Sequence, residues 1–382
     1  MKISQSKPSI GREELSSVNK VFQSGWLGMG KQVFEFENLL KKLFKRKYVI
    51  AVNSGTNAIH IALDSIWLRK NDEVIVPSLT FAGSVQPIIL CGAKPVFCDV
   101  DKDTLNMSEE LIRRKVTRKT KAIIVVHYGG LPCDMDRILK LAKEKHLRII
   151  EDAAHAFGSI YKEKLVGSFG DITCFSFDPI KNITCGEGGA VILDDKKTAD
   201  LIIKKRILGI DKDTWNRYKH KRSWFYSVKE RGYRYHMSNI NAAIGLVQLK
   251  KMDFFISQRQ KIATRYDNAL RKINGIQIIE RDYRKVAPFN YTVMAEKRNN
   301  LMEFLQNSGI TTGINYIPNH LQPLFKSKAA KLPNTEYLYR HIISLPIYSG
   351  MKIKDADYVI SRIKEFYNRK KVTKKVIEQN MP

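Results

Sequence analysis

The sequence has few cysteines and lacks long hydrophobic runs. The five cysteines are an odd number without C-x-x-C spacing, which argues against a disulfide framework and favours reduced, buried thiols: Cys91, Cys98, Cys133, Cys174 and Cys185. No segment approaches the roughly 20 apolar residues that a membrane-spanning helix requires. The first residues turn polar at once, without a secretory apolar segment. We therefore expect a cytoplasmic protein with no membrane insertion.

Acidic residues are also scarce, with 38 Asp and Glu against 66 Lys and Arg and a formal net charge of +28. Such a charge is typical of nucleic-acid binders and of enzymes with polyanionic substrates. The basic residues are nevertheless spread along the whole chain, with local concentrations at 41–47, 113–121, 204–234 and 369–375. No recognition-helix, zinc-finger or aromatic RNA-binding motif accompanies them. We interpret the charge as a solvated basic surface and expect no nucleic-acid partner.

The first half of the chain alternates short apolar segments with helical patterns. The expected strands are residues 48–52, 74–76, 95–100, 122–126 and 148–152. Near-continuous apolar strands of this kind predict an α/β fold whose mostly parallel sheet is covered on both faces. Ligands bind at the carboxyl ends of strands in such sheets. We expect the polar turns that follow the strands to converge on one crevice: 53–57, 78–81, 127–130 and 152–155.

The second half has a different character. Residues 196–234 are basic and aromatic and predict an extended surface loop, whereas 239–273 predict one long helix that bridges two domains. A smaller α+β unit follows from about residue 275, with helices expected at 298–308 and 355–368 and strands at 287–294 and 312–316. We predict a large domain at residues 1–250 and a small C-terminal domain at 251–382.

Lys181 lies in a tight connection between two apolar segments that we expect to be buried strands. Packing on both sides can desolvate its ammonium group, lower its pKa and make the amine a nucleophile. A nucleophilic amine is what Schiff-base chemistry with an aldehyde needs. The alternative is an ordinary loop lysine that faces water, and Lys181 alone does not decide between the two.

Three other features have both a functional and an ordinary structural interpretation. The turn 54–57 follows a strand and opens a helix, so it can bind a phosphate or simply cap that helix. Asp152 can pair with a protonated pyridine nitrogen, or form a salt bridge or cap. Phe81 can stack on a planar ring or fill core. With Lys181, these groups are the set that pyridoxal phosphate requires, and the lysine could then transfer the substrate Cα proton.

The chain resembles the DegT/StrS-type sugar aminotransferases, within the fold-type-I pyridoxal-phosphate enzymes. The resemblance is nearly full length, and its most specific segments are 54–58 (SGTNA), 72–78 (DEVIVPS), 151–156 (EDAAHA), 176–189 (SFDPIKNITCGEGG) and 241–249 (NAAIGLVQL). It implies an aspartate-aminotransferase-like α/β fold, with a mostly parallel seven-stranded sheet between helices and a smaller α+β domain. It also implies a homodimer with shared active sites.

The resemblance assigns roles to individual residues. It implies Lys181 and Asp152 as catalytic, with Lys181 bound to the cofactor aldehyde and Asp152 facing the pyridine nitrogen. The further cofactor-binding residues that it implies are Gly55, Thr56, Asn57 and Ser176 at the phosphate, Phe81 on the ring, His155 near the ring hydroxyl, and Arg234. The substrate-binding residues that it implies are Glu187, Tyr316 and His320, and no metal is implied. The family commonly has asparagine where this chain has Arg234, arginine at His236, and His-Tyr at 315–316.

Relatives that dehydrate carry histidine in place of this lysine, so Lys181 favours amino transfer. The resemblance implies transfer from L-glutamate, through pyridoxamine phosphate, to a nucleotide-linked keto-deoxysugar, in making amino sugars for surface polysaccharide such as the O-antigen of lipopolysaccharide. Glu187 favours C4 over C3, and the basic stretch 204–234, with Arg222, is a candidate for binding the diphosphate. The alternatives are reaction at C3, a non-nucleotide keto-sugar, a related dehydratase, or a non-catalytic basic nucleic-acid-binding or regulatory protein.

Overall fold

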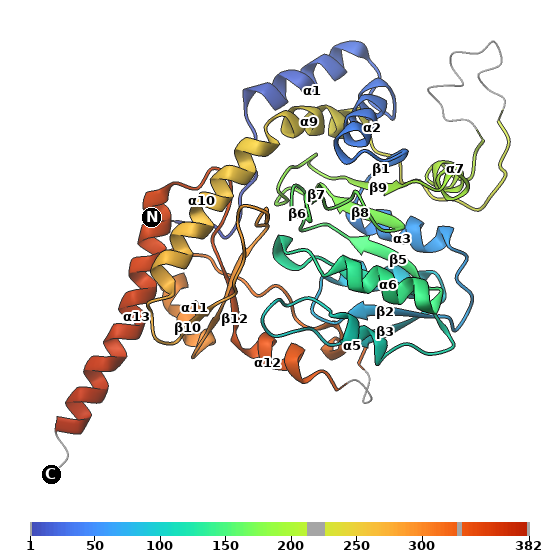
Figure 1. The fold of residues 1–382 in the computed structure, drawn as a ribbon. Coiled ribbons are helices and arrows are strands. Elements are labelled where there is room, and N and C mark those ends of the chain that lie inside the picture. Colours follow the sequence, from blue (N-terminus) through green and yellow to red (C-terminus); the bar gives the residue numbers. More distant parts are fainter. Residues whose placement is uncertain (1, 212–225, 327–330, 380–382) are drawn as a thin grey trace.

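A seven-stranded sheet forms the centre of the structure, a computed structural model that describes residues 2–211, 226–326 and 331–379 (Figure 1). The strand order is β1-β9-β8-β5-β4-β2-β3. The strands are β1 (Tyr48–Val52), β2 (Glu73–Pro77), β3 (Lys94–Cys98), β4 (Thr120–Val126), β5 (Arg148–Asp152), β8 (Ile172–Ser176) and β9 (Gly189–Leu193). Only β9 runs antiparallel to its neighbours β1 and β8, because β8 and β9 form a hairpin. The predicted α/β fold with a mostly parallel sheet is confirmed.

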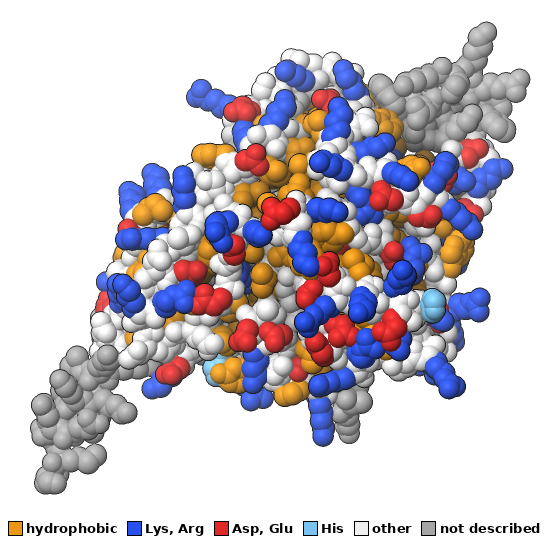
Figure 2. All heavy atoms as spheres, viewed as in Figure 1, with side chains coloured by type: hydrophobic (Ala, Val, Ile, Leu, Met, Phe, Trp, Pro, Cys, Tyr) orange, Lys and Arg blue, Asp and Glu red, His pale blue; other side chains and the backbone are white. Residues whose placement is uncertain are grey.

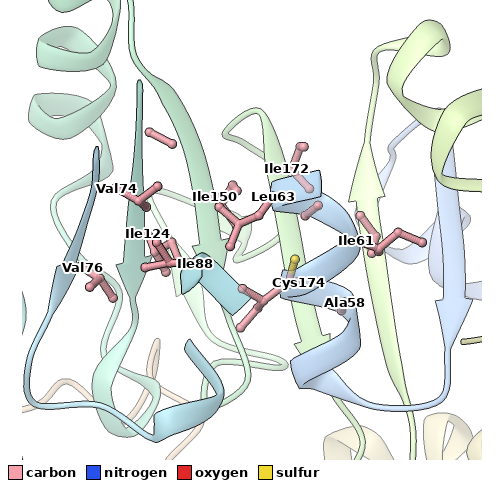
Figure 3. Close-up of a cluster of buried hydrophobic side chains, with 14 of the residues drawn as sticks. Ala58, Ile61, Leu63, Val74, Val76, Ile88, Ile124, Ile150, Ile172 and Cys174 are labelled. Atoms are coloured by element: carbon pink, nitrogen blue, oxygen red, sulfur yellow. The ribbon is translucent and has the colours of Figure 1, made fainter. Parts of the chain in front are cut away.

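Helices cover both faces of this sheet. They are α1 (Arg12–Ser24), α2 (Lys31–Phe44), α3 (Gly55–Ser65), α4 (Gln86–Leu90), α5 (Glu109–Arg113), α6 (Met135–Lys145), α7 (Lys196–Lys205) and α9 (Asn239–Lys250). Successive side chains of a strand point to opposite faces. In β4, Ile124 accordingly belongs to the hydrophobic cluster under α3 and α4, whereas Ile123 and Val125 belong to the cluster on the other face. Figure 3 shows the first cluster, with Ile61 and Leu63 of α3 facing the sheet.

The C-terminal part has its own small sheet and hydrophobic cluster. Its elements are α10 (Met252–Leu270), β10 (Ile276–Ile278), β11 (Tyr291–Ala295), α11 (Arg298–Asn307), α12 (Pro333–His341), β12 (Ile342–Leu345) and α13 (Ile353–Gln379). The antiparallel sheet β10-β11-β12 packs with α10, α11 and α13, and the N-terminal residue Ile3 joins this cluster. In Figure 1, α10 runs from α9 beside the large sheet to the small one. The predicted domain boundary at residue 250 stays a prediction.

Several sequence-based expectations for this half were wrong in detail. Residues 196–205 form helix α7 instead of a loop, because Ala199 and Ile202 turn inward while Lys196 and Lys197 at its start face water. The helix expected at 239–273 is interrupted at Lys251, whose ammonium group is held by Glu13 and Glu14 of α1. The strand expected at 312–316 is reduced to one bridge between Gly313 and Ser344, and the third strand of the small sheet is β12.

The basic residues are spread over the visible surface, as expected from their distribution along the sequence. Figure 2 shows Lys and Arg side chains over the whole visible face, with Asp and Glu side chains among them. Of the helices in the described ranges, none is long and apolar enough to span a membrane. Arg222 and its neighbours at 212–225 lie outside the described residues, so the role predicted for that stretch stays a prediction.

Asp99, directly after β3, ties α12 to the large sheet. Its buried carboxylate accepts the N–H groups of Asn334 (3.0 Å) and Thr335 (2.7 Å) at the start of α12, and the Thr335 hydroxyl (2.7 Å). A carboxylate at a helix N-terminus satisfies N–H groups that have no acceptor within the helix. This contact fixes the small unit against the edge of the large sheet.

We predict that Asp99→Ala lowers the free energy of unfolding by about 3 kcal/mol, because it leaves several buried donors without an acceptor. Urea unfolding followed by circular dichroism measures the change. The exposed Asp103, replaced by Ala, is the control and should change stability by less than about 0.5 kcal/mol. Equal stabilities of the two variants would contradict the assigned role of Asp99.

Candidate active site

A cavity of about 360 Å³ opens at the carboxyl ends of the parallel strands. Most of the residues expected to bind cofactor or substrate line it: Gly55, Thr56, Phe81, Asp152, His155, Ser176, Lys181, Glu187 and Tyr316. They come from the turns after β1, β2, β5 and β8 and from the segment before α12. The predicted convergence is confirmed for the turns 53–57, 78–81 and 152–155, whereas the turn 127–130 is not among the residues that line this cavity.

The N-terminus of α3 and the end of β8 form one side of this cavity. Ser54 caps α3, and its hydroxyl accepts the N–H of Asn57 at 3.1 Å. A Cβ atom on Gly55 would lie 2.6 Å from Ser176 Cβ, so only glycine lets the helix approach this closely. The amides of Gly55 and Thr56 and the hydroxyls of Thr56 and Ser176 thus lie where a phosphate can bind. Asn57 is not among the residues that line the cavity, and its amide donates to Ser54, so its expected phosphate contact stays a prediction.

Asp152 is held in a fixed orientation at the end of β5. It is 6% exposed, and its two carboxylate oxygens accept the N–H of Ala154 (3.1 Å) and the hydroxyl of Ser84 (2.6 Å). Thr80 lies 2.9 Å from the Ser84 hydroxyl and extends this chain of hydrogen bonds. Carboxylate oxygens have further lone pairs, so Asp152 can still accept a hydrogen bond from a protonated ring nitrogen in the cavity.

Lys181 lies in the β8–β9 connection, as predicted, with its side chain half-buried. Its Nζ atom lies 4.2 Å from the centroid of the Phe289 ring. Burial lowers the pKa of Lys181 to about 8, although the carboxylates of Asp178 and Asp152 act in the opposite direction. About a tenth of the amine is therefore unprotonated, and nucleophilic, at pH 7, and this fraction rises as the pH approaches 8.

His155 connects the large sheet to the segment that carries Tyr316. Its ring stacks on Phe289 with centroids 4.1 Å apart, its Nδ1 accepts the N–H of Gly129 (3.4 Å), and its Nε2 lies 2.9 Å from the Tyr316 hydroxyl. Burial lowers the pKa of His155 well below its usual range, so the ring is neutral. With Nδ1 acting as acceptor, the ring proton resides on Nε2 and is donated to the Tyr316 oxygen.

Phe81 and Glu187 lie at the exposed mouth of the cavity. Phe81 is 59% exposed and lies 5.7 Å, centroid to centroid, from Tyr316. Because Phe81 is so exposed, it does not fill core. Its ring is free to stack on a planar group in the cavity. Desolvation and the neighbouring Asp178 raise the pKa of Glu187 above its ordinary value. The mouth therefore offers an aromatic face and a carboxyl group.

Two expected site residues lie elsewhere. The exposed Arg234 lines a second cavity of about 400 Å³ together with Trp26 and His236. His320 is buried, bonded through Nδ1 to the Ser78 hydroxyl at 2.7 Å, and is not among the residues that line the first cavity. Their predicted contacts with cofactor and substrate stay predictions.

Three residues that shape the site were not predicted from the sequence: Ser84, Arg259 and Phe289. Ser84 lies just beyond the predicted turn 78–81 after β2, so its position near a strand end was a usable signal. Arg259 occupies a core position of α10, between Phe255 and Ile262, and a charged residue on the apolar side of a helical pattern was also a signal. Nothing in the local sequence distinguishes Phe289 from an ordinary core residue.

These residues fit pyridoxal 5′-phosphate. The cavity combines amide and hydroxyl donors at a helix N-terminus, a buried carboxylate, an exposed aromatic ring and an amine with a lowered pKa. They match the phosphate, the pyridine nitrogen, the ring face and the aldehyde of that cofactor. In the described ranges, no group of three His, Cys, Asp or Glu side chains is placed to hold a metal ion.

Comparisons with known proteins agree with this chemistry. The family model of the DegT/DnrJ/EryC1/StrS aminotransferases matches residues 8–364. The spore coat polysaccharide biosynthesis protein SpsC of Bacillus subtilis is 38% identical over 372 residues, which cover 94% of this chain and 96% of SpsC.

Solved structures of sugar aminotransferases share the fold. The sugar aminotransferase Spr1654 of Streptococcus pneumoniae in its PLP form, where PLP is pyridoxal 5′-phosphate, superposes with a TM-score of 0.90 at 27% identity over 97% of this chain and 99% of its own. PseC of Helicobacter pylori, an aminotransferase involved in pseudoaminic acid biosynthesis, has a TM-score of 0.90 at 26% identity over 97% of this chain and all of its own. This chain belongs to the DegT/DnrJ/EryC1/StrS family of pyridoxal-phosphate-dependent sugar aminotransferases.

Proposed function

We propose that this enzyme transfers the amino group of L-glutamate to C4 of a nucleotide-linked keto-deoxysugar, with Lys181 and Asp152 as its catalytic residues. The observation that carries the proposal is the half-buried amine of Lys181 in the same cavity as Asp152 and the N-terminus of α3. The product would be an amino sugar for a surface polysaccharide. The relatives named for spore coat polysaccharide and for pseudoaminic acid biosynthesis support such a sugar substrate.

When bound, pyridoxal phosphate supplies an aldehyde for the amine and an electron-withdrawing ring that lets the substrate Cα–H bond ionise. Gly55, Thr56 and Ser176 bind its phosphate with amides and hydroxyls. Asp152, oriented by Ser84 and Ala154, keeps the ring nitrogen protonated.

Lys181 and His155 have different tasks in this mechanism. Lys181 would hold the aldehyde of the bound cofactor through its neutral amine. Once the amino group of the donor substrate has displaced it, the same amine would be placed to accept the substrate Cα proton at Nζ and to return it on the cofactor side. The neutral ring of His155 holds Tyr316 against the cavity wall through its Nε2–H. Both groups act in their uncharged forms.

The proposed substrate contacts lie at the mouth, where Glu187 and Tyr316 can bind sugar hydroxyls, and Glu187 supports reaction at C4. A net charge of +28 attracts a nucleotide diphosphate from solution. We also propose a homodimer in which the exposed Arg234 reaches the phosphate in the partner subunit. The cytoplasmic location and the contact of His320 with substrate stay predictions.

The proposed reaction is tested with the protein loaded with pyridoxal phosphate, L-glutamate labelled with ¹⁵N at its amino group, and nucleotide-linked 4-keto and 3-keto deoxysugars. We expect the label to appear in a 4-amino sugar nucleotide, detected by mass spectrometry, and not in the product of the Lys181→Ala variant. Transfer to the 3-keto sugar alone would reject C4. Transfer only to a keto-sugar without nucleotide would reject the nucleotide-linked substrate.

The assignment of Lys181 predicts a covalent link to the cofactor. Wild-type protein with pyridoxal phosphate should show the visible absorbance band of a Schiff base, and borohydride should fix the cofactor on the peptide that contains Lys181. Lys181→Ala should lose both signals, whereas Lys140→Ala, at an exposed lysine of α6, should retain them. Fixation of the cofactor on another lysine would refute the assignment.

If Ser176 and Thr56 bind the cofactor phosphate, replacing them should lower the affinity for pyridoxal phosphate more than the affinity for pyridoxal. We expect Ser176→Ala and Thr56→Val each to weaken pyridoxal phosphate binding about tenfold, because each removes a hydrogen bond to a charged group. Binding of pyridoxal, which lacks the phosphate, should change less than twofold. A parallel loss for both ligands, measured by titration of the absorbance band, would show that these hydroxyls do not contact the phosphate.

A further inference from the structure

Arg259 of α10 is a buried cation without an acidic partner in the described part of the chain. It is 2% exposed, and its terminal nitrogens donate only to main-chain carbonyls. Nη1 donates to Pro288 (3.4 Å), Phe289 (3.1 Å) and Ile347 (3.5 Å), and Nη2 to Ile180 (3.4 Å) and Lys181 (3.5 Å). Burying an unpaired guanidinium is costly. A core position in α10 alone would be filled more favourably by an apolar side chain.

The five carbonyl acceptors belong to three separate segments. Ile180 and Lys181 lie in the β8–β9 connection, Pro288 and Phe289 precede β11, and Ile347 follows β12. One side chain therefore joins the loop of the reactive lysine to the small sheet. The carbonyls of Lys181 and Phe289 share this guanidinium, and the Phe289 ring lies beneath the Lys181 ammonium group at 4.2 Å. Arg259 thus bonds the main chain of Lys181 and the main chain of Phe289, the residue whose ring lies against the lysine side chain.

We propose that Arg259 is a positioning residue for Lys181, which fixes the lysine's loop against Phe289 and keeps an unneutralised positive charge beside it. The inference rests on the proposed role of Lys181. Arg259 acts only through that lysine and does not line the cavity.

The charged groups around Lys181 determine in which direction its pKa should change when Arg259 is replaced. Asp178 of its own loop and Asp152 at the end of β5 raise the pKa of the amine, whereas burial and the charge of Arg259 lower it. His155, whose ring also packs on Phe289, is neutral. Loss of the Arg259 charge leaves the two carboxylates opposed by burial alone. The pKa of Lys181 should then rise above about 8, and less neutral amine is present at pH 7.

Arg298 provides a matched control. It is also buried, at 8% exposure, and its Nη1 donates to a main-chain carbonyl, that of Ile342, at 3.0 Å. It lies at the start of α11, and its carbonyl acceptor is not part of the Lys181 loop. A variant of Arg298 therefore reports the general effect of removing a buried arginine.

The experiment measures the reactivity of Lys181 in the apoprotein between pH 6 and 10, by labelling with trace acetic anhydride and peptide mass spectrometry. In Arg259→Gln we expect labelling of Lys181 at pH 7 to fall about tenfold, which corresponds to one unit of pKa. Arg298→Gln should leave it within twofold of wild type. Arg259→Lys keeps the charge but not the two-armed guanidinium, so labelling should stay near wild type while kcat falls about tenfold at unchanged KM.

Each outcome decides between the proposals. An unchanged labelling profile in Arg259→Gln, with a loss of thermal stability equal to that of Arg298→Gln, would reduce Arg259 to ordinary structural support and overturn the inference. If Arg259→Gln does not fold, Arg259→Lys decides, and an unchanged kcat overturns the inference. Borohydride fixation of the cofactor on a lysine other than Lys181 in the wild-type protein would instead refute the proposed function itself.

Discussion

The site depends on the close approach of the N-terminus of α3 to the ends of β8 and β9. Two glycines permit it, since a Cβ on Gly55 would meet Ser176 at 2.6 Å and one on Gly189 would meet the carbonyl oxygen of Ser54 at 2.4 Å. The approach brings the free amides of a helix next to the Ser176 hydroxyl, on the same edge of the sheet as Asp152 and Lys181. The hairpin of β8 and β9 makes Lys181 part of this edge, because its turn is the connection that holds the lysine.

The sheet could be predicted from the sequence because its strands are buried on both faces. Strands β1 and β5 were predicted with the bounds that the structure shows, since each reads as a short apolar run followed by a polar turn. The elements that were missed have weaker local signals. Helix α7 is rich in lysine and buries only one narrow side, and β12 is only four residues long. The break falls at Lys251, whose side chain pairs with Glu13 and Glu14 of the distant helix α1, a contact that no local pattern contains.

The residues of the candidate site also differ in how far the sequence predicts them. Asp152, Ser176 and Lys181 belong to turns at strand ends, so the sheet topology alone was enough to place them together. Arg259 and Phe289 come from the small unit, more than 70 residues further along the chain from the Lys181 loop, as the separations in their hydrogen bonds show. Their roles arise from packing between distant segments, which neither periodicity nor spacing encodes. Within this chain Arg234 lines a separate cavity and His320 is bonded to Ser78, so their predicted contacts stay predictions.

The charges of the molecule and of its cavity have opposite signs, and this contrast matters for the proposed nucleotide-linked substrate. The surface is strongly basic, whereas the cavity is lined by Asp152, Asp178 and Glu187 with Lys181 as its lysine. A phosphate bound at α3 is therefore held by amides and hydroxyls, and the lysine does not have to serve as its counter-ion. The amine can then lose its proton near neutral pH, although two carboxylates lie close to it, because burial and the charge of Arg259 outweigh them. In the proposed function the surface charge would attract the substrate, whereas the local balance of charge and burial around Lys181 sets the protonation of its amine.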